Sequence, residues 1–106
     1  MKTILVETYK IKSKDLVPKH DELWNEWIKD VIDNANRNGW KIPPHEHYTN
    51  QGDELGRLFM VVFDDLDHQK MWMSNVKDDK FHEYEDEFKA MVDDWRPLMV
   101  SQYKTY

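Results

Sequence analysis

A run of six consecutive apolar residues, 58–63 (LFMVVF), is the strongest constraint that this sequence places on its fold. The run is far shorter than the roughly 20 residues that a membrane-spanning helix needs, so no membrane insertion is expected. As a strand, it carries Leu58, Met60 and Val62 on one face and apolar residues on the other face as well. Both faces of this strand therefore need apolar cover.

Residues 3–12 (TILVETYKIK) predict a first strand, because β-branched and aromatic residues dominate and helical spacing is absent. The two-residue period places Glu7 and Tyr9 on one face and Thr8 on the other. The sequence leaves open which of these faces lies toward the helices.

The segment after this strand has apolar residues at spacings of three and four, which predicts an amphipathic helix with one wide apolar stripe. Pro18 suits its first turn, and Gly39 suits the left-handed position that ends a helix. The stripe consists of Leu23, Trp24, Trp27, Ile28, Val31, Ile32 and Ala35.

The rest of the chain predicts three more strands and one more helix. Pro43 and Pro44 cannot donate to a β-ladder, so the second strand is expected to be irregular. The second helix is predicted to begin near His68, to break or bend near residues 74–79 and to end at Arg96 and Pro97. The three predicted strands are residues 40–50, 57–64 and 98–106.

This order is βαββαβ, so we predict an α+β chain with a ferredoxin-like fold and a single domain over residues 1–106. Right-handed crossovers place both helices on one face of the antiparallel sheet. The other face of residues 58–63 then has no cover within the chain. A symmetric partner is the simplest cover, which predicts a homodimer in the form of a dimeric α+β barrel.

Composition excludes several function classes. The net charge is −6 and no basic stripe is present, so nucleic acid is not expected as a partner. The absence of cysteine excludes disulfides, thiolate nucleophiles and cysteine-based metal sites. The N-terminus is too polar for a signal peptide, and a cytoplasmic location is expected.

Three local features carry a resemblance to a known family. They are Ser13-Lys14 after the first strand, Gly39-Trp40 before the second, and Phe63-Asp64-Asp65-Leu66 leading into a helix with Trp72. With this layout the chain resembles the dimeric α/β-barrel superfamily, near the antibiotic-biosynthesis-monooxygenase-like and NIPSNAP-like proteins. The resemblance implies a ligand cavity between sheet and helices. Activities in the superfamily include cofactor-free oxygenation, haem degradation and polyketide cyclisation, but the Asn–Trp–His set of the haem-degrading members has no residue-by-residue match here.

His45-Glu46-His47 is the most conspicuous chemical feature of the sequence. In a strand the two imidazoles lie on one side, about 6–7 Å apart. With Glu7 they would form a two-histidine, one-carboxylate metal set; otherwise they line a polar pocket or lie half-exposed on an edge strand. We expect no metal and no cofactor. Glu7, on a central strand, either lines the cavity as a base or ligand-binding group or forms a salt bridge.

Other residues have less specific interpretations. Trp27 and Trp72 are either core residues or walls of an apolar cavity. His20, at the start of a helix, is expected to have no specific role, and the acidic residues 83–87 are expected to form a solvated helix face.

These observations favour a small-molecule binding protein with an apolar, aromatic-lined cavity for a lipid-like or polyketide-like ligand. The alternative is a cofactor-independent monooxygenase or cyclase/isomerase that uses the same cavity, and a purely structural dimer is a third possibility. Whether the chain is an enzyme stays open. The predicted ligand-binding residues are Glu7, Tyr9, Trp27, His45, His47 and Trp72.

Overall fold

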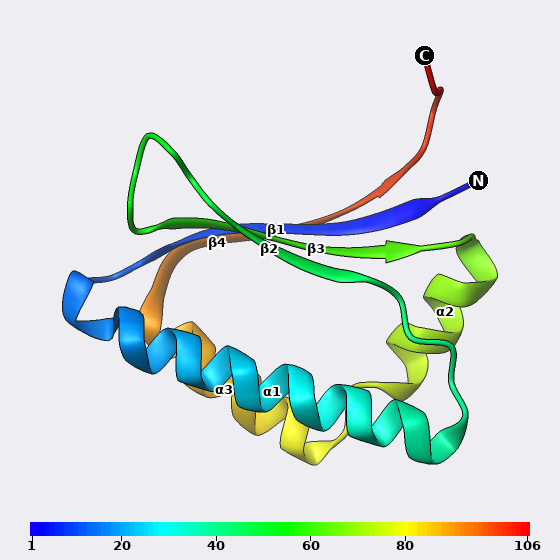
Figure 1. The fold of residues 1–106 in the computed structure, drawn as a ribbon, viewed down its shortest axis with the longest axis horizontal. Helices are drawn as coiled ribbons and strands as arrows, with labels where there is room; N and C mark the ends of the chain where they lie inside the picture. The colour runs from blue at the N-terminus through cyan, green and yellow to red at the C-terminus, as the bar shows by residue number, and fades with distance from the viewer.

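A computed structural model shows a four-stranded antiparallel sheet whose helices all lie on one face (Figure 1). The strands are ordered β2-β3-β1-β4 across the sheet. This confirms the predicted ferredoxin-like βαββαβ arrangement. Along the chain the elements are β1 (Thr3–Ile11), the 3-10 helix η1 (Lys14–Leu16), α1 (Val17–Asn38), β2 (His45–Thr49), β3 (Gly56–Phe63), α2 (Leu66–Asn75), α3 (Asp79–Met91) and β4 (Val92–Ser101).

The central strand β1 settles which side chains face the helices. Glu7 pairs in register with Phe59 of β3 and Pro97 of β4. Glu7 lines the space between the sheet and the helices, and Tyr9, on the same face, is buried, whereas Thr8 is exposed on the opposite face. The question that the sequence left open is therefore answered in favour of Glu7.

Helix α1 buries most of the predicted apolar stripe, with Ile28 and Ile32 half-buried, and it ends where the sequence indicates. Gly39 adopts a left-handed conformation with φ 69°, and the N–H of Trp40 donates to the carbonyl of Ala35 at 3.0 Å. This geometry caps the last turn of the helix. The buried residues of α1 are His20, Leu23, Trp24, Trp27, Val31 and Ala35.

Of the break or bend predicted near residues 74–79, the structure shows the break, between α2 and α3. The Asp65 side chain accepts a hydrogen bond from the His68 backbone N–H at 2.8 Å and caps α2. The Asp78 side chain accepts one from the Phe81 backbone N–H, also at 2.8 Å, and caps α3. Each aspartate satisfies backbone donors that a new helix leaves free, so it starts a separate helix.

Two predicted boundaries are wrong. The second helical segment ends at Met91, and β4 already begins at Val92, so Arg96 and Pro97 lie inside a strand. Proline is tolerated there because β4 is at the edge of the sheet. Strand β2 starts only at His45, because the prolines before it cannot donate to the ladder.

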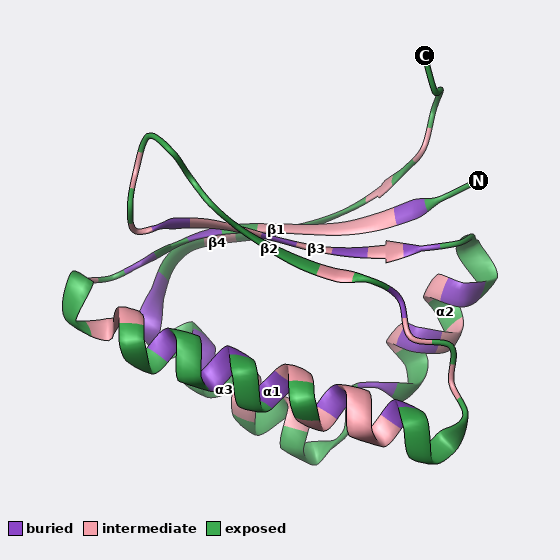
Figure 2. Cartoon of the chain, viewed as in Figure 1, coloured by how far each residue is buried: buried purple, intermediate pink, exposed green.

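The two faces of the sheet differ in their cover (Figure 2). The inner face carries the core, including Phe59, Val61 and Phe63 of β3. The outer face has no helix over it (Figure 1). Its apolar side chains are half-buried or exposed, and they are Ile4, Val6, Leu58, Met60, Val62, Leu98 and Val100. No helix is both long and apolar enough to cross a membrane.

Phe63→Ala should destabilise the fold strongly, because Phe63 is 0 % exposed in the core. We expect the free energy of unfolding to fall by about 3–5 kcal/mol in urea denaturation. The matched control is Tyr103→Ala, at a side chain that is 94 % exposed, where a change within about 0.5 kcal/mol is expected. Equal losses in the two variants would contradict the packing described here.

Candidate functional site

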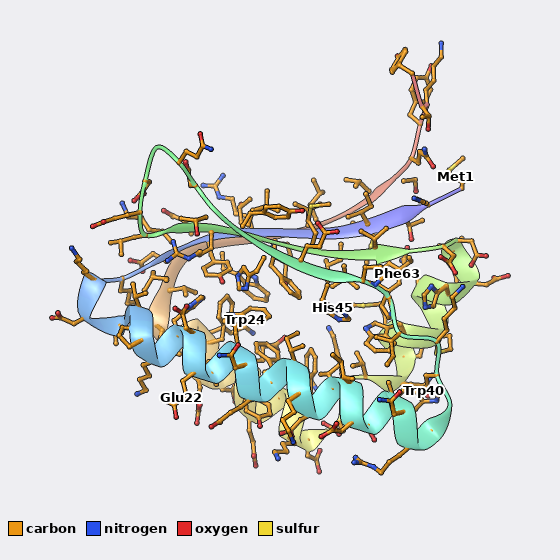
Figure 3. All side chains as sticks on the ribbon, in the orientation of Figure 1. Met1, Glu22, Trp24, Trp40, His45 and Phe63 are labelled. Carbon is orange, nitrogen blue, oxygen red and sulfur yellow. The ribbon has the colours of Figure 1, made fainter.

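A cavity of about 180 Å³ lies between the sheet and the helices, and 13 of its 18 lining residues are hydrophobic. The rings of Trp24 and Trp27 stack with centroids 4.8 Å apart on the α1 side. Figure 3 shows Trp24 and His45 in this layer, between the strands and α1. The aromatic lining residues are Trp24, Trp27, Phe59, Trp72, Phe81, Phe88 and Trp95.

Glu7 supplies a carboxyl group to the sheet side of the cavity. The indole Nε1–H of Trp95 donates to Glu7 Oε1 at 3.1 Å. Burial raises the pKa of Glu7, and the bond from Trp95 offsets part of that rise. The group is thereby moved toward its neutral form, in which a carboxyl can also donate a hydrogen bond.

His45 adds an imidazole to the same cavity. Its Nδ1 lies 2.6 Å from the carbonyl oxygen of Pro43. A carbonyl can only accept, so Nδ1 carries a proton and Nε2 of the neutral ring is an acceptor. Burial lowers the pKa of His45 and favours this neutral form. The ring lies 5.6 Å from that of Trp72, centroid to centroid.

Tyr9 and His47 lie beside the cavity and not in its lining. The Tyr9 hydroxyl is 2.6 Å from His20 Nε2 and 2.5 Å from His47 Nε2. His20 Nδ1 in turn lies 2.9 Å from a carboxylate oxygen of Asp21. These four residues, Asp21, His20, Tyr9 and His47, form a hydrogen-bonded chain that we call the tyrosine–histidine cluster.

The environment of this cluster opposes charge on its rings. His47, taken as a whole residue, is exposed at the sheet edge on β2. Its ring, however, packs edge-on against the rings of Trp24 and Phe59, with centroids 4.7 and 5.3 Å away. Burial of the ring lowers its pKa to about 4, helped by His20 and Arg57. Burial also lowers the pKa of His20, and it raises the pKa of the Tyr9 phenol.

The structure distributes the predicted site residues over these two places. Glu7, Trp27, His45 and Trp72 line the cavity, whereas Tyr9 and His47 belong to the cluster. The metal set of His45, His47 and Glu7 is not assembled, because the three side chains have separate partners. No group of three or more histidine, cysteine, aspartate or glutamate residues is arranged to hold a metal ion.

Two residues of these sites are missing from the set predicted from the sequence. His20, for which the sequence predicts no specific role, is 2 % exposed and bonded to Tyr9. Its position on the apolar side of α1, one turn before Trp24, is the available signal. Trp95 falls within the predicted second helix, and only the earlier start of β4 brings its indole to Glu7.

The histidines predict a loss of stability in mild acid. The pKa values of His20, His45 and His47 are all lower than the ordinary value of 6.5, so at these three side chains the unfolded chain binds more protons than the folded chain below that pH. The raised pKa of Glu7 acts in the opposite direction, as one group against three. The free energy of unfolding should therefore decrease as pH falls from 6.5 toward 5. Urea denaturation at pH 8, 6.5 and 5 measures this decrease.

His45→Gln should reduce the pH-dependent decrease, because glutamine keeps a donor for the Pro43 carbonyl but does not titrate. Lys41→Gln, at an exposed residue, is the control and should leave the decrease unchanged. A wild-type free energy that is constant from pH 8 to 5 would contradict the buried, neutral state of the histidines.

Comparison with solved structures places the fold among known proteins. Neither a family model nor a curated protein matches the chain in sequence. A mutant of SnoaB from Streptomyces nogalater, described as a cofactor-independent oxygenase, superposes with a TM-score of 0.70 at 10 % identity, covering 98 % of this chain and 95 % of its own. A NIPSNAP family protein from Agrobacterium tumefaciens gives 0.70 at 8 %, covering 97 % and 94 %. A conserved protein from Methanosarcina mazei gives 0.72 at 10 %, with the same two coverages. The chain thus shares its fold, over nearly its whole length, with a cofactor-independent oxygenase and a NIPSNAP family protein.

Proposed function

We propose that the chain binds a small, mainly apolar molecule in the cavity between sheet and helices. The observation that carries this proposal is an aromatic-lined cavity of about 180 Å³ with Glu7 and His45 among its few polar groups. An apolar protein cavity of about 150 Å³ holds a molecule of the size of benzene. The volume thus favours a lipid-like or polyketide-like ligand with one or two rings over an extended acyl chain.

The polar groups indicate that the ligand carries a hydroxyl group. His45 Nε2 is an acceptor without a partner among the bonds of the protein, since only Nδ1 is engaged, by Pro43. Glu7 has one oxygen bonded to Trp95 and a second oxygen available to a ligand. A ring with a hydroxyl at its edge satisfies such groups, whereas a pure hydrocarbon leaves them unpaired in the cavity.

His45 also supports a second candidate function, a cofactor-independent monooxygenase or a cyclase/isomerase in the same cavity. A neutral imidazole with a free Nε2 is able to take a proton from a ligand hydroxyl or an acidic carbon. SnoaB, which is described as a cofactor-independent oxygenase, shares the fold at 10 % identity. Binding without reaction needs only the cavity, so we rank binding first.

Binding of 2-naphthol and naphthalene, followed by quenching of tryptophan fluorescence, tests the ligand class. Four tryptophans line the cavity, and both probes should quench them. His45→Phe keeps an apolar ring but removes the acceptor, so the affinity for 2-naphthol should fall about fivefold to tenfold, as expected for one lost hydrogen bond. The affinity for naphthalene should stay unchanged or rise.

The control for this substitution is His82→Phe at an exposed residue of α3, which should change neither affinity. If neither probe binds to the wild-type chain, the proposed cavity function is wrong. If His45→Phe weakens both probes equally, the acceptor role of His45 is wrong and only apolar binding stands.

The outer face of the sheet supports a homodimer as part of this proposal. Leu98 of β4 is 61 % exposed, and it pairs in register with Val6 of β1. A contiguous apolar face of this kind is costly to leave in water. A second copy of the chain would cover this outer face with its own outer face, which makes an isologous interface.

Leu98→Glu should convert the dimer into a monomer, because a symmetric interface would bring two like charges into the same apolar layer. Native mass spectrometry and light scattering after size exclusion measure the state. Leu66→Glu, on α2 at 49 % exposure, is the matched control and should remain dimeric. A monomeric wild-type chain at micromolar concentration would refute the dimer.

A further inference from the structure

The tyrosine–histidine cluster lies outside the cavity and has no part in the proposed ligand binding. It joins three elements, since Tyr9 comes from β1, His20 from the first turns of α1 and His47 from β2. It borders a separate surface hollow of about 200 Å³, whose lining includes His20, His47 and Asp21. The hollow gives the cluster contact with solvent.

The hydrogen atoms of the cluster follow from its acceptors. The Asp21 carboxylate accepts from His20 Nδ1–H, so Nε2 of a neutral His20 is bare and accepts the single proton of the Tyr9 hydroxyl. His47 must then donate its Nε2–H to the Tyr9 oxygen. Two imidazole nitrogens and one phenol oxygen, three groups that can each bind a metal ion, thus converge at one place beside the hollow.

We propose that His20 Nε2, His47 Nε2 and the Tyr9 oxygen together bind one divalent first-row transition metal ion. Imidazole nitrogen is a preferred ligand of zinc and copper ions, and a phenolate adds a negatively charged oxygen. The site differs from the His45, His47 and Glu7 set considered from the sequence, because it replaces two of those residues by groups that the fold brings to His47.

The two distances between the Tyr9 oxygen and the imidazole nitrogens need only a small adjustment. Donor atoms at about 2.0–2.1 Å from a tetrahedral zinc ion lie about 3.3 Å from one another. The two oxygen–nitrogen distances are 2.5 and 2.6 Å, so each has to lengthen by less than 1 Å. His20 and Tyr9 are buried, whereas His47 is exposed on the edge strand β2 and lines the hollow, so the adjustment falls on the ligand with the most open surroundings.

Neighbouring groups fit a metal site. A carboxylate on the far nitrogen of a ligating histidine orients the ring and increases its basicity, and Asp21 does this for His20. Burial raises the pKa of Tyr9, so its ionisation needs a cation beside it, and the Trp24 indole N–H, which is buried without a hydrogen-bond partner, offsets only part of that rise. It has no bond to the neutral phenol, so ionisation of Tyr9 would give it a charged acceptor.

One nearby charge opposes a cation. Arg57 lines the hollow, although its guanidinium donates away from the cluster, to the backbone carbonyls of Glu54 and Gly56. The divalent ion and Arg57 together carry three positive charges, and the Tyr9 phenolate and the Asp21 carboxylate carry two negative charges. The resulting local charge is about +1, which is lower than the charge of the ion alone.

Binding releases one proton. The Tyr9 O–H bond breaks as the oxygen–metal bond forms, and this proton leaves to solvent. The proton on His47 moves from Nε2 to Nδ1 through solvent, so that Nε2 bonds the metal and the ring stays neutral. Affinity should therefore fall about tenfold for each unit that pH decreases.

The test is titration calorimetry of the full chain with Zn²⁺ in two buffers of different ionisation enthalpy, which measures the protons released. One equivalent should bind with one proton released and a tyrosinate difference band in the ultraviolet. Asp21→Asn should weaken binding about 10- to 100-fold, as loss of an outer-shell partner does, and His47→Ala should weaken it more.

Tyr9→Phe should weaken binding and abolish both the proton release and the tyrosinate band. His82→Ala, at an exposed histidine of α3, is the control and should leave the tight site intact. Far-ultraviolet circular dichroism shows that each variant is folded. The proposal is overturned if wild type binds Zn²⁺ no more tightly than folded His47→Ala, or if Tyr9→Phe binds it with the same affinity and the same proton release.

Discussion

The register of the central strand β1 determines where the chemistry of this protein lies. β1 pairs with both β3 and β4, so its inner face is covered by helices and its side chains there leave water. Three of them, Thr3, Glu7 and Tyr9, are polar, and the two that are ionisable both have side-chain hydrogen-bond partners. Glu7 finds the indole of Trp95, and Tyr9 finds two histidines. The cavity and the tyrosine–histidine cluster both follow from this one strand.

Local sequence patterns were sufficient to predict the fold, but they did not predict the hydrogen-bond partners of Glu7 and Tyr9. The stripe of α1, its end at Gly39 and the βαββαβ order depend on spacing and on backbone preferences, which are visible in a short stretch of sequence. The bond of Tyr9 to His47 joins residues 38 apart, and that of Trp95 to Glu7 joins residues 88 apart. No local pattern encodes such distances, and the early start of β4 follows from tertiary pairing with β1.

His45 and His47 show why the same face of a strand does not mean the same site. Both point toward the helices, as the period of a strand requires. Two residues of strand advance the chain by about 6–7 Å. This distance is enough to place His45 in the cavity and His47 beside Tyr9, outside the cavity. One ring is therefore an acceptor for a ligand, while the other is a member of a polar chain that reaches the surface.

Trp24 is the wall between these two environments. Its ring stacks on Trp27 at 4.8 Å on the cavity side and meets His47 edge-on at 4.7 Å on the other. An unpaired buried donor such as its N–H costs about 1–3 kcal/mol, and a neutral Tyr9 does not remove that cost. Burial raises the pKa of Tyr9 by more than this N–H lowers it, so the phenol is neutral without a cation beside it. The Trp24 side chain thus lines the cavity with its ring and borders the tyrosine–histidine cluster with its unpaired N–H.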